Sequence, residues 1–359
     1  MTPLSFDYPI SVAILYYAGV GGDMEDGIEC ARGIAQALEE QGHQVHLVQV
    51  DERNWLKTVR TPGEVIFNLV EDDNWELYTK VGLKLEQLGR AQVGHDIRVF
   101  KYITKKARVK RRMQALGIST PAFRILNRSS SLTVRGLEYP LIVKPSGQHA
   151  GIGISQDSVV IDQDELTERV KYLFKYFPGE VVVEEFIDGR EIHITILGNN
   201  RRLIALPTTE IEFTGEFADN WDVYTYNAKW EKNTWEYWQA RVFSPARLSK
   251  KDTQKLEKLA LKAYRSFDCK DIVRMDIRFN EKNHKAYIVD VNMSPSLNKY
   301  DNQDATLASV LALGWTYEEF IETLIAITYK RVYGRLPDRT RTRQFLLALP
   351  AGRQASPTI

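Results

Sequence analysis

Cysteine is scarce in this chain, which has only Cys30 and Cys269 among its 359 residues. Two cysteines can neither build a disulfide framework nor supply the four ligands of a structural zinc site, so small stapled scaffolds are excluded. Such sparse use fits a reducing compartment. We expect both residues to be small, buried and apolar.

An excess of charge of either sign is also missing, because 48 Lys and Arg residues face 47 Asp and Glu residues. The balance argues against a bulk nucleic-acid binder or an acidic disordered chain. Long apolar runs are lacking too: the run 10–17 is far shorter than the roughly 20 residues that span a bilayer, and Asp7 stands where a signal peptide would be basic. We therefore expect a cytoplasmic protein without a membrane partner.

The chain is long enough for two or three structural units, since 359 residues exceed the usual size of one domain. Its first hundred residues alternate apolar runs at 10–17, 45–50 and 65–69 with an amphipathic helix at 24–41. This order predicts parallel βαβ units. The glycines after the first strand do not match G-x-G-x-x-G, so a turn facing a substrate is favoured over a nicotinamide site.

A basic run, KYITKKARVKRR at 101–112, holds seven cations and no acid. A nucleic-acid surface is one interpretation, and a solvated helix face with one or two functional lysines is the favoured one, because aromatic residues are not interleaved for base stacking. The strand 139–145 then ends in Lys144 and Pro145, and three glycines follow within 147–153. Glycine backbone and a lysine charge fit a flap over phosphates.

Polar residues alternate with apolar ones on two later strands. Arg274 and Asp276 share one face of the strand 272–279, and Asp290 and Asn292 share a face of the strand 286–292. Paired as a hairpin, these strands would offer oxygen ligands suited to Mg²⁺, with Arg274 beside them for a phosphate or an oxyanion. Ordinary solvent-facing alternation is the alternative. Farther upstream, Asp188 and Gly189 predict a tight turn between two strands.

Taken in order, these segments resemble the ATP-grasp superfamily and, within it, the D-alanine–D-alanine ligase family. The resemblance runs from about residue 10 to about residue 327. It is carried by YPLIVKPSGQHAGIGIS (139–155), VVVEEFIDGREIHITILGN (181–199) and DIVRMDIRFNEKNHKAYIVDVNMSPS (271–296), with weaker matches at FNLVED, LGISTPAF and YNAKW.

The resemblance implies an α/β protein, α+β in its ATP-binding part, with the ATP-grasp fold. An N-terminal doubly wound α/β substrate domain (1–100), a central small domain with the glycine-rich flap (101–188) and a C-terminal antiparallel-sheet catalytic domain (189–336) would precede a mobile tail (337–359). It also implies a ligase that forms an amide through an acyl phosphate and releases ADP and phosphate.

Site roles are implied residue by residue. The catalytic pair would be Arg274 and Lys229. The residues that contact the nucleotide would be Lys106, Lys144, His149, Gly151, Gly153, Glu184, Glu185, Phe186, Ile187 and Glu191. Mg²⁺, with Mn²⁺ as an alternative, would bind Asp276, Asp290 and Asn292, and the substrate would contact Asp23, Glu25, Ser296 and Asp301. Partners would be small-molecule carboxylates and amines, neither nucleic acid nor membrane, and relatives of this kind are often homodimers.

The chain also departs from the family. Ala150 and Trp230 stand where the family's flap serine and loop tyrosine are expected, and the N-terminal acid is ambiguous between Asp23 and Glu25. Asp301 falls near the serine expected to receive a substrate carboxylate, which an acid would repel. We therefore expect substrates other than two D-alanines, as His149, Asp72 and Asp73 also indicate. A catalytically silent nucleotide-binding regulator is the alternative function.

One further segment, 221–238, holds seven aromatic residues. A core-packed loop is one interpretation, and a lid lining an aromatic or extended pocket is the other.

Overall fold

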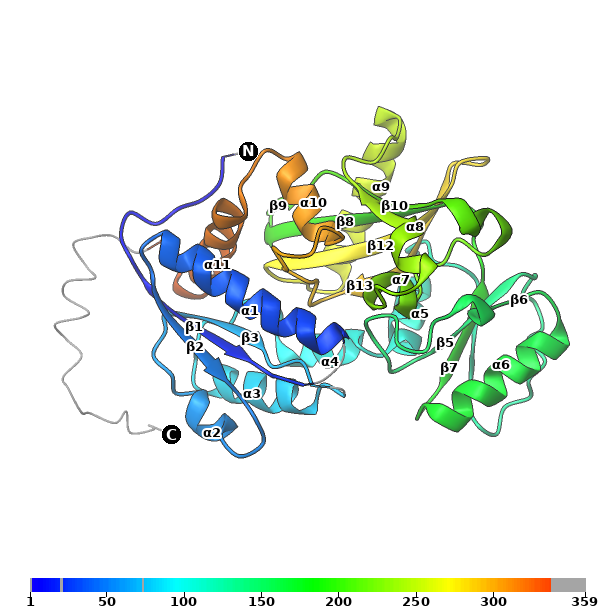
Figure 1. Ribbon diagram of the computed structural model, residues 1–359, viewed down its shortest axis with the longest axis horizontal. Helices are drawn as coiled ribbons and strands as arrows, with labels where there is room; N and C mark the ends of the chain where they lie inside the picture. Colours follow the sequence, from blue (N-terminus) through cyan, green and yellow to red (C-terminus); the bar gives the residue numbers. More distant parts are fainter. Residues whose placement is uncertain (1, 20–21, 73, 337–359) are drawn as a thin grey trace.

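The computed structural model describes residues 2–19, 22–72 and 74–336, with the backbone alone at 22–24. The chain forms three sheets that lie side by side along the long axis of the molecule (Figure 1). The predictions for Asp73 and for the tail 337–359 lie outside the described residues. Within the described ranges, no helix has both the length and the apolar character needed to cross a bilayer.

The N-terminal sheet is parallel, in the order β2-β1-β3, as the βαβ pattern predicts. Alternate residues of β1 face opposite sides, so that Val12 and Ile14 pack toward α1 and α11 (Tyr317–Tyr333), whereas Ala13 and Leu15 pack toward α3. Burial of both faces explains the continuous apolar run in the sequence. The elements are β1 (Ser11–Tyr16), α1 (Gly22–Glu40), β2 (Gln44–Gln49), α2 (Trp55–Thr58), β3 (Val65–Leu69) and α3 (Glu76–Gln87).

The small sheet is antiparallel, in the order β4-β7-β5-β6, and α6 covers one of its faces (Figure 1). Asp162 caps α6, because its carboxylate accepts hydrogen bonds from the backbone amides of Asp164 and Glu165. The elements are β4 (Phe123–Leu126), β5 (Leu141–Pro145), β6 (Val159–Val160), α6 (Gln163–Tyr176) and β7 (Val181–Glu185). A 3₁₀ turn at Gln156–Ser158 separates the glycine loop from β6.

The large sheet is antiparallel, in the order β11-β10-β8-β12-β13, with β9 paired to β8. Its elements are β8 (Arg190–Asn199), β9 (Arg202–Ala205), β10 (Thr209–Phe213), α7 (Tyr226–Trp230), α8 (Trp235–Gln239), β11 (Ala240–Phe243), α9 (Lys250–Ser266), β12 (Ile272–Asn280), β13 (Lys285–Asn292), α10 (Ala305–Ala312) and α11 (Tyr317–Tyr333). The predicted hairpin is confirmed as β12 and β13.

Two helices that follow the N-terminal sheet and precede the small sheet in the chain pack with the large sheet. Phe100 of α4 (Ile97–Ile103) and Met113 of α5 (Lys106–Ala115) lie in the same apolar core as Ile194 and Met275. The C-terminal α11 packs in the other direction, since Phe320 shares a core with β1. These helices share apolar cores with the N-terminal sheet and the large sheet, whereas the small sheet packs around a core of its own.

The predicted tight turn at Asp188 and Gly189 is wrong as a hairpin. The strands on either side of it, β7 and β8, belong to different sheets, so the segment is a connection between two sheets. Gly189 has φ of 150°, and a Cβ there would lie 2.3 Å from the carbonyl oxygen of Phe279. The glycine is therefore required by the close approach of this connection to β12.

Candidate functional site

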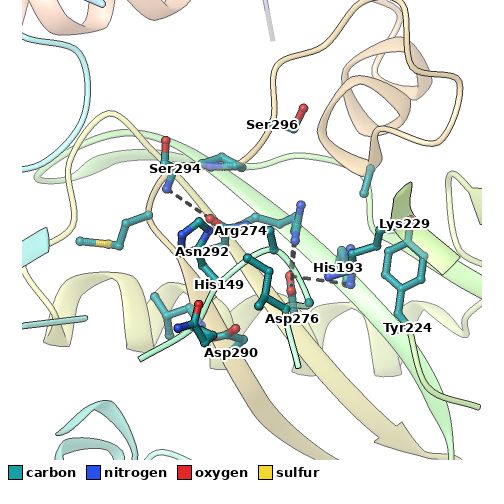
Figure 2. A pocket seen from close by; sticks show the side chains of 18 of the residues that line it. His149, His193, Tyr224, Lys229, Arg274, Asp276, Asp290, Asn292, Ser294 and Ser296 are labelled. Atoms are coloured by element: carbon teal, nitrogen blue, oxygen red, sulfur yellow. Dashed lines mark hydrogen bonds and ion pairs between the residues drawn. The ribbon is translucent and has the colours of Figure 1, made fainter. Parts of the chain in front are cut away.

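A cavity of about 320 Å³ lies where the three sheets meet, and its walls come from all three. Its floor is the β12–β13 hairpin, whose register pairs Arg274 with Asn292 and Asp276 with Asp290. Because side chains two residues apart share a face, all four point to the same side of the sheet (Figure 2). A register shift after Asp276 ends this regular pairing.

The charges on this floor are balanced by close partners. Arg274 forms a two-point ion pair with Asp276, with Nε–Oδ1 at 2.8 Å and Nη2–Oδ2 at 3.1 Å, and His193 Nε2 lies 3.7 Å from the same carboxylate. Burial acts to raise the pKa of Asp276, but the Arg274 and His193 charges hold it well below its ordinary value. Asp276 is therefore ionised at neutral pH.

Asp290 is held in the same way by a residue from another element. Lys106 of α5 places its Nζ 2.7 Å from Asp290 Oδ2. Burial acts to raise the pKa of Asp290, and the Lys106 charge lowers it below the ordinary value. Helix α5 is thereby tied to the hairpin by an ion pair that faces the cavity.

The donor set on the hairpin fits a hard divalent cation. Asp276 and Asp290 are opposite one another on neighbouring strands, and Asn292 adds an amide oxygen, which also accepts a hydrogen bond from the Ser294 amide at 3.2 Å. Mg²⁺ takes few protein ligands and completes its shell with phosphate and water oxygens. In the described part of the chain, no cluster of three or more His, Cys, Asp or Glu side chains is placed to bind a metal, so an all-protein cage is not built here.

Two further lysines line the cavity. Lys144, on β5, places its Nζ 2.6 Å from Glu184 Oε1. Lys229, on α7, lies 4.8 Å above the ring of Tyr224, and burial together with the Arg274 charge lowers its pKa. Lys106, Lys144, Lys229 and Arg274 thus converge from four elements on one space, as anionic phosphates require.

The segment from Glu184 to Ile187 borders the cavity where the chain leaves the small sheet. Arg278 fixes it, because its Nε donates to the Ile187 carbonyl at 3.1 Å and its guanidinium lies 5.2 Å above the Phe186 ring. Nη1 of Arg278 also lies 3.3 Å from Glu191 Oε2. The pKa of Glu191, which burial acts to raise, is lowered by His193 and Arg278, so this acceptor stays ionised.

The glycine loop closes over the cavity. Trp230 Nε1 donates to the Ala150 carbonyl at 2.8 Å, and the ring of His149 lies 4.5 Å from that of Trp75. Gly151 has φ of 83° and lines the cavity. Gly153 does not line it: a Cβ there would lie 3.0 Å from Phe177, so this glycine serves the packing of the small domain rather than the predicted nucleotide contact.

Acidic side chains gather at the opposite end of the cavity. Ser296 and Asp301 line it as predicted, and Asp26 and Asp304 join them. Glu25 is exposed and lies outside the lining, which corrects the prediction, because a helix turns about 100° per residue and brings the next residue inward. The side chain of Asp23 is outside the described part.

Burial shifts two of these acids. It raises the pKa of Asp26 to about 6 and that of Asp304 to about 7. Among the described residues, no Lys or Arg lies within ion-pair distance of Asp26, Asp301 or Asp304. Near neutral pH, Asp26 and Asp304 are therefore partly protonated, and within the described ranges Asp301 and Asp304 have only the more distant charges of Lys232 and Arg274 to offset their own.

Several residues in or near the cavity were not among the predicted site residues. His193 and Arg278 follow from two-residue alternation, since the first faces the same way as Glu191 and the second the same way as Asp276. Predicting Asp26 as a cavity residue would have required knowing which face of α1 points toward the cavity. Lys110 is buried within the basic run, and finding it would have required knowing where α5 begins.

The aromatic segment contributes both to a local core and to the wall of the cavity. Trp235 packs in a local core with Phe217, whereas Tyr224 and Trp230 line the cavity. Trp238 is 58% exposed and belongs to neither group.

Comparison with known proteins agrees with this geometry. A family model described as the D-Ala D-Ala ligase C-terminus matches residues 113–326. A D-alanine–D-alanine ligase of Haemophilus influenzae is 25% identical over 316 residues, covering 86% of this chain and 98% of the relative. Another, of Aquifex aeolicus, is 28% identical over 287 residues, covering 80% and 91%. The structure of a Bacillus anthracis D-alanine–D-alanine ligase complexed with ATP superposes with a TM-score of 0.71 at 18% identity, covering 91% of this chain and 99% of that one.

Proposed function

The chain belongs to the D-alanine–D-alanine ligase family and has its ATP-grasp fold, and from this premise we propose that it joins a carboxylate to an amine other than D-alanine through an acyl phosphate. It is an ATP-dependent ligase that forms an amide bond. The product is a dipeptide or a related amide. ADP and phosphate leave.

The observation that carries this proposal is the register of the hairpin. It sets Arg274 against Asn292 and Asp276 against Asp290 beneath a cavity that three lysines also enter. Phosphoryl transfer asks a protein chiefly for positioning and for charge, and this arrangement supplies both. Ordinary solvent-facing alternation would not bring four cations from separate elements to the cavity above these acids.

The reaction then proceeds in two steps. A carboxylate oxygen of the first substrate attacks the γ-phosphorus and ADP leaves, and the amine nitrogen of the second attacks the acyl carbon and phosphate leaves as the amine loses a proton. Lys106, Lys144 and Lys229 neutralise phosphate oxygens, and Arg274 stabilises the tetrahedral oxyanion. Asp276, Asp290 and Asn292 would hold Mg²⁺ or Mn²⁺, which supplies further charge to the phosphates.

The loop 146–155 excludes water from the reactive intermediate. Ala150 of this loop accepts a hydrogen bond from Trp230, and His149 of the loop packs against Trp75, which follows the N-terminal sheet in the chain. Both contacts hold the loop over the cavity. An acyl phosphate hydrolyses when water enters, so closure favours amide formation. The segment Glu184–Ile187 holds the adenine and Glu191 accepts from the ribose, with His149 and Gly151 near the phosphates.

The acidic end of the cavity supports an unusual acceptor. Ser296, Asp301, Asp26 and Asp304 would lie around the second substrate, and carboxylates there repel an acceptor that carries a carboxylate of its own. We propose a neutral or cationic amine acceptor for this site. The partners are then small molecules.

An ADP-release screen tests the proposal. Purified protein with Mg²⁺-ATP is offered pairs of L- and D-amino acids, diamines and amides, and products are identified by mass. Lys144→Ala and Asp290→Ala should abolish turnover, and full activity in both would refute the site. D-Alanine alone turned over at the rate of a D-alanine–D-alanine ligase would refute the acceptor, and ATP binding without turnover on any pair would favour a silent regulator.

A further inference from the structure

Lys110 is buried although it lies within the most basic stretch of the chain. It is 3% exposed and stands one helical turn after Lys106 on α5. Its Nζ donates to Thr120 Oγ1 at 2.8 Å, and Thr120 in turn donates to the Ile288 carbonyl at 2.8 Å. A buried lysine is rare unless its charge is paired, so its partner is informative.

That partner is Glu184, which two lysines share. Lys110 pairs with Glu184 Oε2, and Lys144 Nζ lies 2.6 Å from Glu184 Oε1. Glu184 is 1% exposed. Two cations therefore face one buried carboxylate, and the group carries one positive charge in excess on the side of Lys144, which lines the cavity.

We propose that Lys110 is a positioning residue for nucleotide binding: by occupying one oxygen of Glu184, it leaves Lys144 incompletely neutralised and free to bind nucleotide phosphates. This inference rests on the proposed function, in which Lys144 contacts ATP. Lys110 itself does not line the cavity, and it acts through Glu184.

The physical reason is the competition for Lys144. Without Lys110, Glu184 and Lys144 form a closed neutral pair in a low-dielectric environment, and the lysine must give up part of that pair to meet a phosphate. With Lys110 in place, Glu184 is satisfied from both sides. Burial acts to raise the pKa of Glu184, but both lysines lower it, so the carboxylate remains charged between them.

The test is the phosphate contribution to affinity, measured as the ratio of adenosine to Mg²⁺-ADP dissociation constants by calorimetry on the full chain. Lys110→Met keeps the aliphatic stem and removes the charge. We expect it to lower this ratio about tenfold, the effect of one charge-assisted hydrogen bond, with adenosine affinity unchanged. Arg111→Met, on the exposed side of the same helix, should leave the ratio as in the wild type.

A merely structural role gives a different result, because distortion of β7 would weaken adenosine and ADP alike and leave the ratio constant. A double variant, Lys110→Met with Glu184→Gln, removes both buried charges and protects folding. The double variant frees Lys144 from its buried partner, so the ratio of dissociation constants should recover toward the wild-type value. Any contact between Glu184 and the adenine affects adenosine and ADP equally and therefore cancels in this ratio.

The outcomes separate this inference from the proposed function. A wild-type protein that binds ADP no better than adenosine overturns both. A strong wild-type preference that Lys110→Met retains overturns the inference alone, as does a double variant whose ratio stays at or below that of the single variant.

Discussion

Arg274 and Asp276 lie two residues apart on one face of β12 and form a two-point ion pair across the floor of the cavity. The bidentate geometry fixes the plane of the guanidinium and keeps the carboxylate ionised. One strand thus presents the proposed oxyanion partner and the proposed metal ligand in a fixed relation. Lysine would carry the charge but could not reproduce the two parallel bonds.

Arg274→Gln should lower the rate of ADP release with an active substrate pair about 100- to 1,000-fold, because a preorganised oxyanion donor is removed. Affinity for ADP should change much less. Arg241→Gln, on the exposed face of β11, is the matched control and should retain full turnover. A variant that is folded by circular dichroism and turns over within threefold of the wild type would contradict the role of Arg274.

Two tryptophans offer a matched pair for the flap. Trp230 Nε1 donates to the Ala150 carbonyl at 2.8 Å, and Trp238 Nε1 donates to the Lys232 carbonyl at the same distance on the exposed surface. Trp230→Phe should loosen the flap and admit water, so that phosphate release exceeds amide formation by several-fold. The measurement is the ratio of ADP to amide product. Trp238→Phe should keep the ratio of ADP to amide near one. Equal ratios in both variants would show that the hydrogen bond from Trp230 to Ala150 does not hold the flap closed.

A buried ion pair joins α11 to the start of β12, an interior strand of the large sheet. Asp271 is fully buried, and Arg331 Nη2 lies 2.6 Å from its Oδ2. Arg331→Met leaves that carboxylate without its counter-charge and should lower the free energy of unfolding by about 3 kcal/mol in urea titrations. Lys282→Met removes an ion pair with Asp188 whose side chains are 85% and 76% exposed, and it should cost less than about 1 kcal/mol. Similar losses in both would contradict the difference in burial.

The shared face of Arg274, Asp276, Asp290 and Asn292 could be predicted from the sequence, because side chains alternate along a strand with a period of two. Once the turn of the hairpin is placed, the turn determines which residues of the two strands pair. Helical positions were harder. Glu25 was expected in the cavity and Asp26 lies there, since a one-residue error on a helix rotates the side chain by about 100°.

Contacts between distant segments could not be read from local pattern. The pairing of Lys110 with Glu184 joins a helix to a strand 74 positions later, and nothing in the basic run distinguishes it from its exposed neighbours until α5 begins at Lys106. Likewise Asp188 and Gly189 have the composition of a hairpin turn, yet the strands they connect pair with other partners. Strand register and turn composition can be read from neighbouring residues, whereas the packing of distant segments depends on which side chains are buried together.

Asp304 gives the protein a pH dependence whose sign follows from its burial. It is 5% exposed, and its carboxylate accepts from the amide of Leu307 at 2.7 Å as the cap of α10. Burial raises its pKa to about 7. The folded state therefore holds the proton more tightly than the unfolded state, so this contribution to stability is full below about pH 4 and is lost as the pH rises through 7.

Asp304→Asn keeps an oxygen for the cap and has no charge to bury. The variant should be more stable than the wild type by roughly 1 to 4 kcal/mol at pH 8, since one pKa unit corresponds to about 1.4 kcal/mol, and the difference should shrink toward zero at pH 4. Thermal unfolding across that range measures it. Asp219→Asn, on the exposed surface, should give a difference that does not change with pH. An equal gain for Asp304→Asn at both ends of the range would show that the amide packs better and that the buried charge is not the cause.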